Sequence, residues 1–74
     1  MRLRITEVNY TASHRWLFEL EDDLGSKYFI MQSQFYAARG LKDPVTRVML
    51  DSYDRGQWIT ARTQLIDGIN VVVA

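Results

Sequence analysis

Apolar and polar residues alternate near the end of the chain in two runs that are separated by Asp67-Gly68. Such alternation is typical of β-strands, whose successive side chains point to opposite faces. The pattern predicts strands over residues 57–65 and 69–73. Asp-Gly between two such runs is a strong signal for a β-hairpin. We therefore predict a C-terminal hairpin, around which the other elements must be arranged.

The register of this hairpin depends on the length of its loop. A two-residue turn at Asp67-Gly68 pairs Ile66 with Ile69. A three-residue loop, which includes Ile66, pairs Leu65 with Ile69 instead. Because a slip of one residue turns a whole strand over, the buried face decides the register. The three-residue loop gathers the apolar residues on one side, and Gly68 supplies the left-handed residue that ends it.

We predict the three-residue register, which assigns residues to two faces of the hairpin. The predicted buried residues are Ile59, Ala61, Leu65, Val71 and Val73. The predicted outer face carries Trp58, Thr60, Arg62, Gln64 and Asn70, with Val72 beside them.

Alternation also predicts three strands in the first half of the chain, over residues 2–10, 14–21 and 27–31. In the first of them the phase changes at Thr6-Glu7. A β-bulge or a sharp bend produces such a change, and small barrels use one where a strand turns a corner. The alternative is that this strand ends at Glu7.

The second and third strands are joined by a turn cluster at residues 22–26. A loop of three or five residues sets Lys27 opposite Glu21, as a cross-strand ion pair. The same register groups the bulky side chains on one face, which favours it. These side chains are Trp16, Phe18, Leu20, Tyr28 and Ile30.

Residues 32–54 change to a helical period. Ser33 is a predicted N-cap for a short helix that Gly40 ends. Asp43-Pro44 indicates a second helix, with aspartate as N-cap and proline at the first helical position. Apolar residues then recur three and four positions apart, at Val45, Val48, Met49 and Tyr53.

The predicted order is three strands, a helical segment and two strands, in one domain over residues 1–74. A bend in the first strand lets it pair with both groups of strands, which closes a barrel and removes exposed edges. The bend at Thr6-Glu7, the helical segment 33–53 and the hairpin within 56–73 resemble the layout of the OB-fold. The resemblance implies a mainly β, five-stranded antiparallel OB-like barrel with a helical segment between strands 3 and 4. An SH3-like barrel and an open antiparallel sheet with helices on one face are the alternatives.

Composition and charge narrow the functional classes. A chain of 74 residues that is 47% hydrophobic indicates one folded domain with a modest core. Nine basic and nine acidic residues cancel, which argues against strong non-specific binding to nucleic acid or anionic membranes. No apolar run approaches the roughly 20 residues that cross a bilayer, and the start lacks a signal-peptide core. We expect a cytoplasmic protein with no membrane partner.

The sequence offers no recognisable catalytic, metal-binding or phosphate-binding motif. It has no cysteine, and His14 is its single histidine, so the donor sets typical of zinc are missing. The carboxylates at residues 21–23 match no calcium loop. We therefore expect no metal and no cofactor, and a binding protein rather than an enzyme.

Aromatic and basic residues share the outer faces of two predicted strands. OB-folds bind single strands through such a mixture, in which aromatic rings stack on bases and arginine or lysine follows the backbone. The resemblance therefore implies a module that binds single-stranded nucleic acid through the outer face of the C-terminal hairpin. Its candidate site residues are Trp58, Arg62, Thr60, Gln64, Arg2 and Arg4.

Two other interpretations stay open. Trp58 can instead pack beneath the helical segment, with the arginines as ordinary solvated surface of an antiparallel sheet. Alternatively, the neutral charge, small size and abundant aromatic residues favour a protein-interaction module. Such a module would be an accessory subunit, a homo-oligomer, or a phage- or plasmid-type regulator of a host protein machine.

Overall fold

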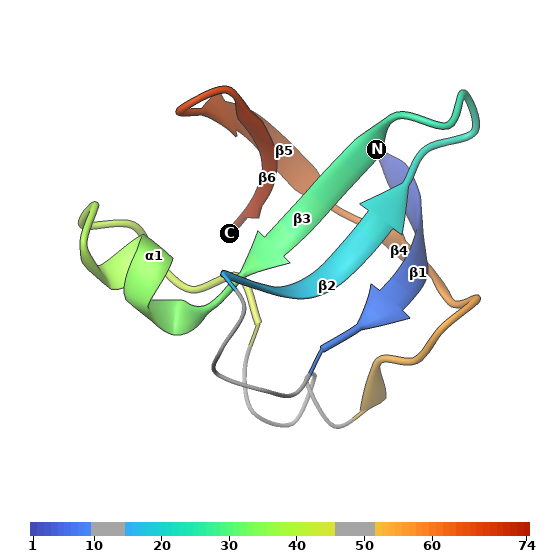
Figure 1. The fold of residues 1–74 in the computed structure, drawn as a ribbon, viewed down its shortest axis with the longest axis horizontal. Coiled ribbons are helices and arrows are strands. Elements are labelled where there is room, and N and C mark those ends of the chain that lie inside the picture. Colours follow the sequence, from blue (N-terminus) through green and yellow to red (C-terminus); the bar gives the residue numbers. More distant parts are fainter. Residues whose placement is uncertain (10–14, 46–51) are drawn as a thin grey trace.

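A computed structural model describes residues 1–9, 15–45 and 52–74 of the chain (Figure 1). These residues form a mainly β structure with little helix. Its elements are β1 (Arg2–Val8), β2 (Trp16–Glu21), β3 (Lys27–Met31), α1 (Ser33–Ala37), β4 (Trp58–Thr60), β5 (Arg62–Ile66) and β6 (Ile69–Val73). Within the part of the chain that the structure describes, no helix is long and apolar enough to span a membrane.

The strands form one mixed sheet in the order β4-β1-β2-β3-β6-β5. Its neighbouring strands are antiparallel except β3 and β6, which run parallel. The described residues thus form six strands, with a parallel pair and with β4 and β5 as edges. The prediction of a five-stranded, closed antiparallel barrel is therefore wrong in three respects: the number of strands, the closure of the sheet and the direction of one strand pair. Figure 1 shows the sheet strongly curled, with β5 and β4 running behind β3 and β2.

The sixth strand arises because the predicted strand over residues 57–65 changes partner at Ala61. Before Ala61, β4 pairs with β1, and after it, β5 pairs with β6. The Ala61 N–H still donates to the Met1 carbonyl at 2.8 Å, so the change takes place within one residue. The two edge strands of the sheet are therefore consecutive in the chain.

The irregularity predicted in the first strand is confirmed. The register of β1 against β2 shifts between Ile5 and Glu7, which leaves Thr6 as the extra residue. The Thr6 hydroxyl donates to the backbone carbonyl and to the carboxylate of Glu19, both at 3.1 Å. As expected for a bent first strand, β1 pairs with both β2 and β4.

Two helices were expected after β3, and the structure describes the first. α1 begins at Ser33, but its N-cap is Gln32, whose backbone is extended and whose side chain makes no capping bond. Ser33 is therefore not the cap. Gly40 has the left-handed φ of 66° expected where the helix ends. Most of the second predicted helix, residues 46–51, lies outside the described residues, as do residues 10 and 14, the predicted end and start of the first two strands.

The register of β2 against β3 is the predicted one over most of its length. Lys27 lies opposite Glu21, and its ammonium is 3.0 Å from the Glu21 carboxylate. The register then shifts between Trp16 and Phe18. Because of this shift, Trp16 leaves the face of Phe18, and its predicted place on that face is wrong.

Apolar side chains pack on both faces of the sheet. Leu3, Ile5, Phe18, Leu20, Ile30 and Val72 form the cluster inside the curl. On the other face, α1 contributes to a second cluster of Met31, Phe35, Tyr36 and Val71, against which Trp16 also packs. β6 supplies Val71 to one cluster and Val72 to the other, so it is buried on both faces.

The hairpin has the two-residue turn, and the predicted three-residue register is wrong. Ile66 pairs with Ile69, and Gln64 pairs with Val71. Asp67 and Gly68 have φ of 51° and 78°, the left-handed pair of a type I′ turn, whose twist matches that of the strands.

The corrected register changes the burial of the hairpin. Leu65, predicted in the core, is 68% exposed, whereas Val72, predicted on the outer face, is buried. Val71 is buried, and Arg62 and Gln64 are exposed, as predicted. The remaining predicted core residues, Ile59, Ala61 and Val73, are half-buried.

The Tyr36 hydroxyl joins β3 to β6. It donates to the Val72 carbonyl at 2.7 Å and accepts the Met31 N–H at 3.1 Å. The backbone ladder between these parallel strands pairs Phe29 with Val71, and the hydroxyl extends that connection by two hydrogen bonds. Burial raises the pKa of Tyr36 to about 12.

Gly68→Val should destabilise the protein by at least about 1 kcal/mol, because a β-branched residue is strained in a left-handed backbone. No atom lies within 4 Å of a Cβ added at Gly68, so the cost is conformational rather than a clash. Gly68→Asn is the matched control and should lose less, since asparagine tolerates this region. Urea denaturation measures both; a valine variant with the wild-type midpoint would contradict the turn assignment.

Tyr36→Phe should destabilise the protein by about 1–3 kcal/mol, because it leaves a buried N–H and a buried carbonyl unpaired. The folded pKa of about 12 exceeds the ordinary value of 10.0, so the stabilisation is complete below about pH 10. It is lost as the pH rises through 12. The gap in unfolding free energy between wild type and variant should therefore narrow over this window, and a constant gap would argue against a buried neutral hydroxyl.

Candidate functional site

Four of the six predicted site residues lie side by side on β1 and β4. Arg2 faces Thr60, and Arg4 faces Trp58, across the antiparallel pair. Directly opposite residues share a face, so the four side chains belong to one surface. Leu3, between the arginines, points to the other face and is fully buried. We call Arg2, Arg4, Trp58 and Thr60 the β1–β4 strip.

Trp58 is held in the strip by a cation–π contact. Trp58 is 44% exposed. The Arg2 guanidinium lies over its ring, 5.0 Å from the ring centroid. At an exposed site such a contact is worth about 0.5–1 kcal/mol, so another planar or cationic group can compete for the ring. Trp58 is thus a surface residue and is not packed beneath the described part of the helical segment.

The other two predicted site residues lie on β5. Arg62 and Gln64 are exposed, opposite Val73 and Val71 of β6. The structure does not place them in the β1–β4 ladder, because the chain changes partner at Ala61. Arg62 is nevertheless two residues beyond Thr60 and follows the strip along the chain.

An acidic turn borders the strip. Asp22 carboxylate oxygens accept the N–H groups of Leu24 and Ser26, each at 2.9 Å, and the hydroxyl of Tyr28 at 3.2 Å. The bond from the Ser26 N–H is the main reason that the pKa of Asp22 lies below its ordinary value, so this carboxylate is ionised at neutral pH. The turn and the strip share a hollow of about 310 Å³, lined by Met1, Arg2, Asp22, Asp23 and Trp58.

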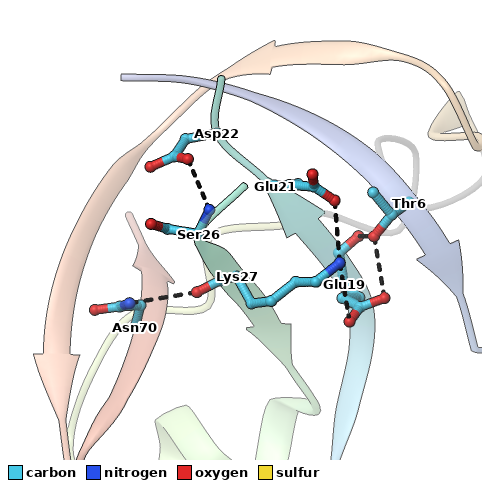
Figure 2. A network of polar contacts seen from close by, with 7 residues as sticks. All are labelled: Thr6, Glu19, Glu21, Asp22, Ser26, Lys27 and Asn70. Carbon is cyan, nitrogen blue, oxygen red and sulfur yellow. Dashed lines mark hydrogen bonds and ion pairs between the residues drawn. The ribbon is translucent and has the colours of Figure 1, made fainter. Parts of the chain in front are cut away.

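A charged band lies beside the strip on β2 and β3 (Figure 2). The Lys27 ammonium is 3.0 Å from the Glu21 carboxylate and 3.7 Å from that of Glu19. Its hydrogen bond to Glu21 is the main cause that raises the pKa of Lys27. Glu21 also lies opposite Arg4 on β1. The strip therefore combines cations with nearby carboxylates, whose charges partly cancel.

A second aromatic surface, which the sequence analysis did not single out, lies on β2 and β3. The rings of Trp16 and Phe29 are 5.8 Å apart and tilted by 47°. We call the groove of about 140 Å³ beside them the Trp16 groove; it is lined by Arg15, Trp16, Phe29, Met31 and Ile69. The register shift after Trp16 turns this residue outward, and simple alternation gave no signal for that shift.

Both surfaces offer groups for stacking, hydrogen bonding or apolar contact. Across residues 1–9, 15–45 and 52–74, no three histidine, cysteine, aspartate or glutamate side chains gather where they could hold a metal ion. The strip offers a ring for stacking and guanidinium groups for hydrogen bonding. The groove offers apolar contact beside one cation.

Comparisons of this chain with protein-family models, with curated protein sequences and with solved structures found no significant match.

Proposed function

We propose that this protein is a small, non-enzymatic, OB-like cytoplasmic module that binds single-stranded nucleic acid through the β1–β4 strip. The observation that carries the proposal is the strand pairing that places two arginines and a threonine around an exposed tryptophan. Tryptophan stacks on any base, and arginine contacts the phosphates that connect the bases.

The OB-like part of the proposal draws its support from the connections of the sheet. β1 pairs with both β2 and β4 through a bulge, as a strand that turns the corner of a barrel does. The two edge strands, β4 and β5, are separated in the chain by Ala61 alone. These two described edge strands therefore follow each other in the chain, although β4 and β5 are not hydrogen-bonded to each other in the sheet.

In the proposed complex a base stacks on Trp58 in the place that the Arg2 guanidinium occupies in the free protein. Arg2 then turns to a phosphate, and Arg4 and Arg62 contact phosphates on either side. Thr60 and Gln64 supply hydrogen-bond donors and acceptors that can pair with groups of any nucleotide. The ionised Asp22 beside the strip limits the total electrostatic attraction, so the dependence on salt should be shallow.

Trp58→Ala should weaken binding of a fluorescein-labelled oligothymidine by about 1–3 kcal/mol, the usual value of one stacked base. Arg4→Ala should reduce the slope of log affinity against log salt by about 0.7, because one phosphate contact to a single strand is lost. Fluorescence anisotropy between about 20 and 150 mM salt, where screening increases, measures both quantities. Arg39→Ala is the matched control, since Arg39 is paired with Asp67 and lies outside the strip.

Circular dichroism of each variant separates loss of binding from loss of folding. Trp58→Phe should keep part of the affinity, because it keeps a ring that can stack. Absence of binding by the wild-type protein at about 20 mM salt, where phosphate contacts are least screened, rejects the proposal. Equal affinities of wild type and folded Trp58→Ala would reject the strip as the binding surface.

A protein-interaction module is the second candidate function. The specific observation in its favour is the Trp16 groove, whose lining differs in chemistry from that of the strip.

A further inference from the structure

The Trp16 groove has an apolar interior and a charged rim. Met31, which is 2% exposed, is the buried residue of its lining. Half-buried aromatic and aliphatic side chains of Trp16, Phe29 and Ile69 line the rest. The backbone next to Trp16 is held in place, because the Gln32 N–H donates to the Arg15 carbonyl at 3.0 Å. The groove is thus built on paired strands rather than on a loose loop.

The volume of the groove matches one aromatic ring. It measures about 140 Å³, close to the roughly 150 Å³ of an apolar cavity that takes up benzene. The Met31 side chain in its lining is flexible, and its thioether makes favourable contacts with aromatic rings. A larger bicyclic ring would extend beyond the groove into solvent.

The lining also distinguishes between kinds of ring. Nucleobases carry N–H groups and carbonyls on their edges, and burying such a group without a hydrogen-bond partner is unfavourable. The groove interior is almost wholly apolar and offers these groups few partners. A phenyl ring has no such groups, so the lining favours a phenylalanine side chain over a base.

The rim adds a requirement for negative charge. Arg15 is exposed, and no hydrogen bond or ion pair from another described residue engages its guanidinium. Arginine matches the planar shape of a carboxylate and can bind it through two parallel hydrogen bonds. A carboxylate adjacent to the inserted ring would therefore complement this end of the groove.

We propose that the Trp16 groove docks a phenylalanine side chain from an extended, acidic segment of a partner protein, with a carboxylate of that segment at Arg15. This site uses side chains on and beside β2, β3 and β6, whereas the nucleic-acid proposal uses β1, β4 and β5, so the two stand independently. Burial of one phenyl ring beside one surface ion pair gives a weak anchor, to which the rest of a peptide would add contacts.

The probe is 3-phenylpropionate, which joins a phenyl ring to a carboxylate, titrated into the full chain labelled at the methionine and isoleucine methyl groups. Saturable NMR shifts at Met31 and Ile69, with a dissociation constant in the millimolar range, are the expected result. The uncharged 3-phenylpropanamide, and the Arg15→Ala variant with the acid, should each bind about two- to fivefold more weakly, the range of one exposed ion pair. Arg55→Ala, which removes a surface arginine paired with Glu7, should leave the binding unchanged.

Two further variants test whether the probe binds in the Trp16 groove. Ile69→Phe fills the groove and should abolish the shift at Met31 while its spectrum shows a folded protein. Trp58→Ala should bind 3-phenylpropionate as the wild type does, because the strip takes no part. Absence of saturable shifts up to about 20 mM probe, some ten times a typical millimolar dissociation constant, overturns the proposal. So do larger shifts of the same methyls with adenosine monophosphate, which would make the groove a nucleotide site.

Discussion

The hydroxyl of Tyr36 connects two halves of the sheet that the chain forms separately. The first half is the meander β1-β2-β3, and the second is the hairpin β5-β6, which follows after a long connection. The two halves meet at the parallel pair of β3 and β6. The Tyr36 hydroxyl is hydrogen-bonded to the backbone of both of these strands. α1, which carries Tyr36, has five residues and is too short to be stable alone. Its position therefore depends on this buried contact and on the second apolar cluster, in which Phe35 and Tyr36 pack with Met31 and Val71.

The same junction explains why the hairpin register was mispredicted. The prediction gathered apolar residues on one face, which is the right criterion for a sheet with one buried face. β6, however, is central in the sheet, with the curled interior on one side and α1 on the other. Val71 and Val72 are both buried, so apolar grouping no longer chooses between registers. Turn chemistry then decides, because Asp67-Gly68 suits a type I′ turn.

Features determined by neighbouring residues could be predicted from the sequence, and features determined by distant contacts could not. The bounds of β3, the Thr6 bulge and the Lys27–Glu21 pair follow from alternation and turn residues. The parallel β3–β6 pair and the change of partner at Ala61 depend on contacts between distant segments, for which one sequence gives no signal. For the site, alternation predicted that Arg2, Arg4, Trp58 and Thr60 face outward. It could not show that Arg62 and Gln64 belong to the other edge strand.

The arrangement of charge on the outer face bears on whether the two surfaces serve one ligand. Glu21 lies opposite Arg4 of the strip, and Glu19 lies opposite Phe29 of the Trp16 groove. Both carboxylates therefore stand between the two surfaces, and Lys27 is the cation that bridges them (Figure 2). A nucleic-acid strand that reached from Trp58 to Trp16 would bring its phosphates over this pair, at a cost from like-charge repulsion. An acidic peptide confined to the Trp16 groove would instead have the Arg15 cation beside it. The charged band thus favours two separate ligands over one continuous path.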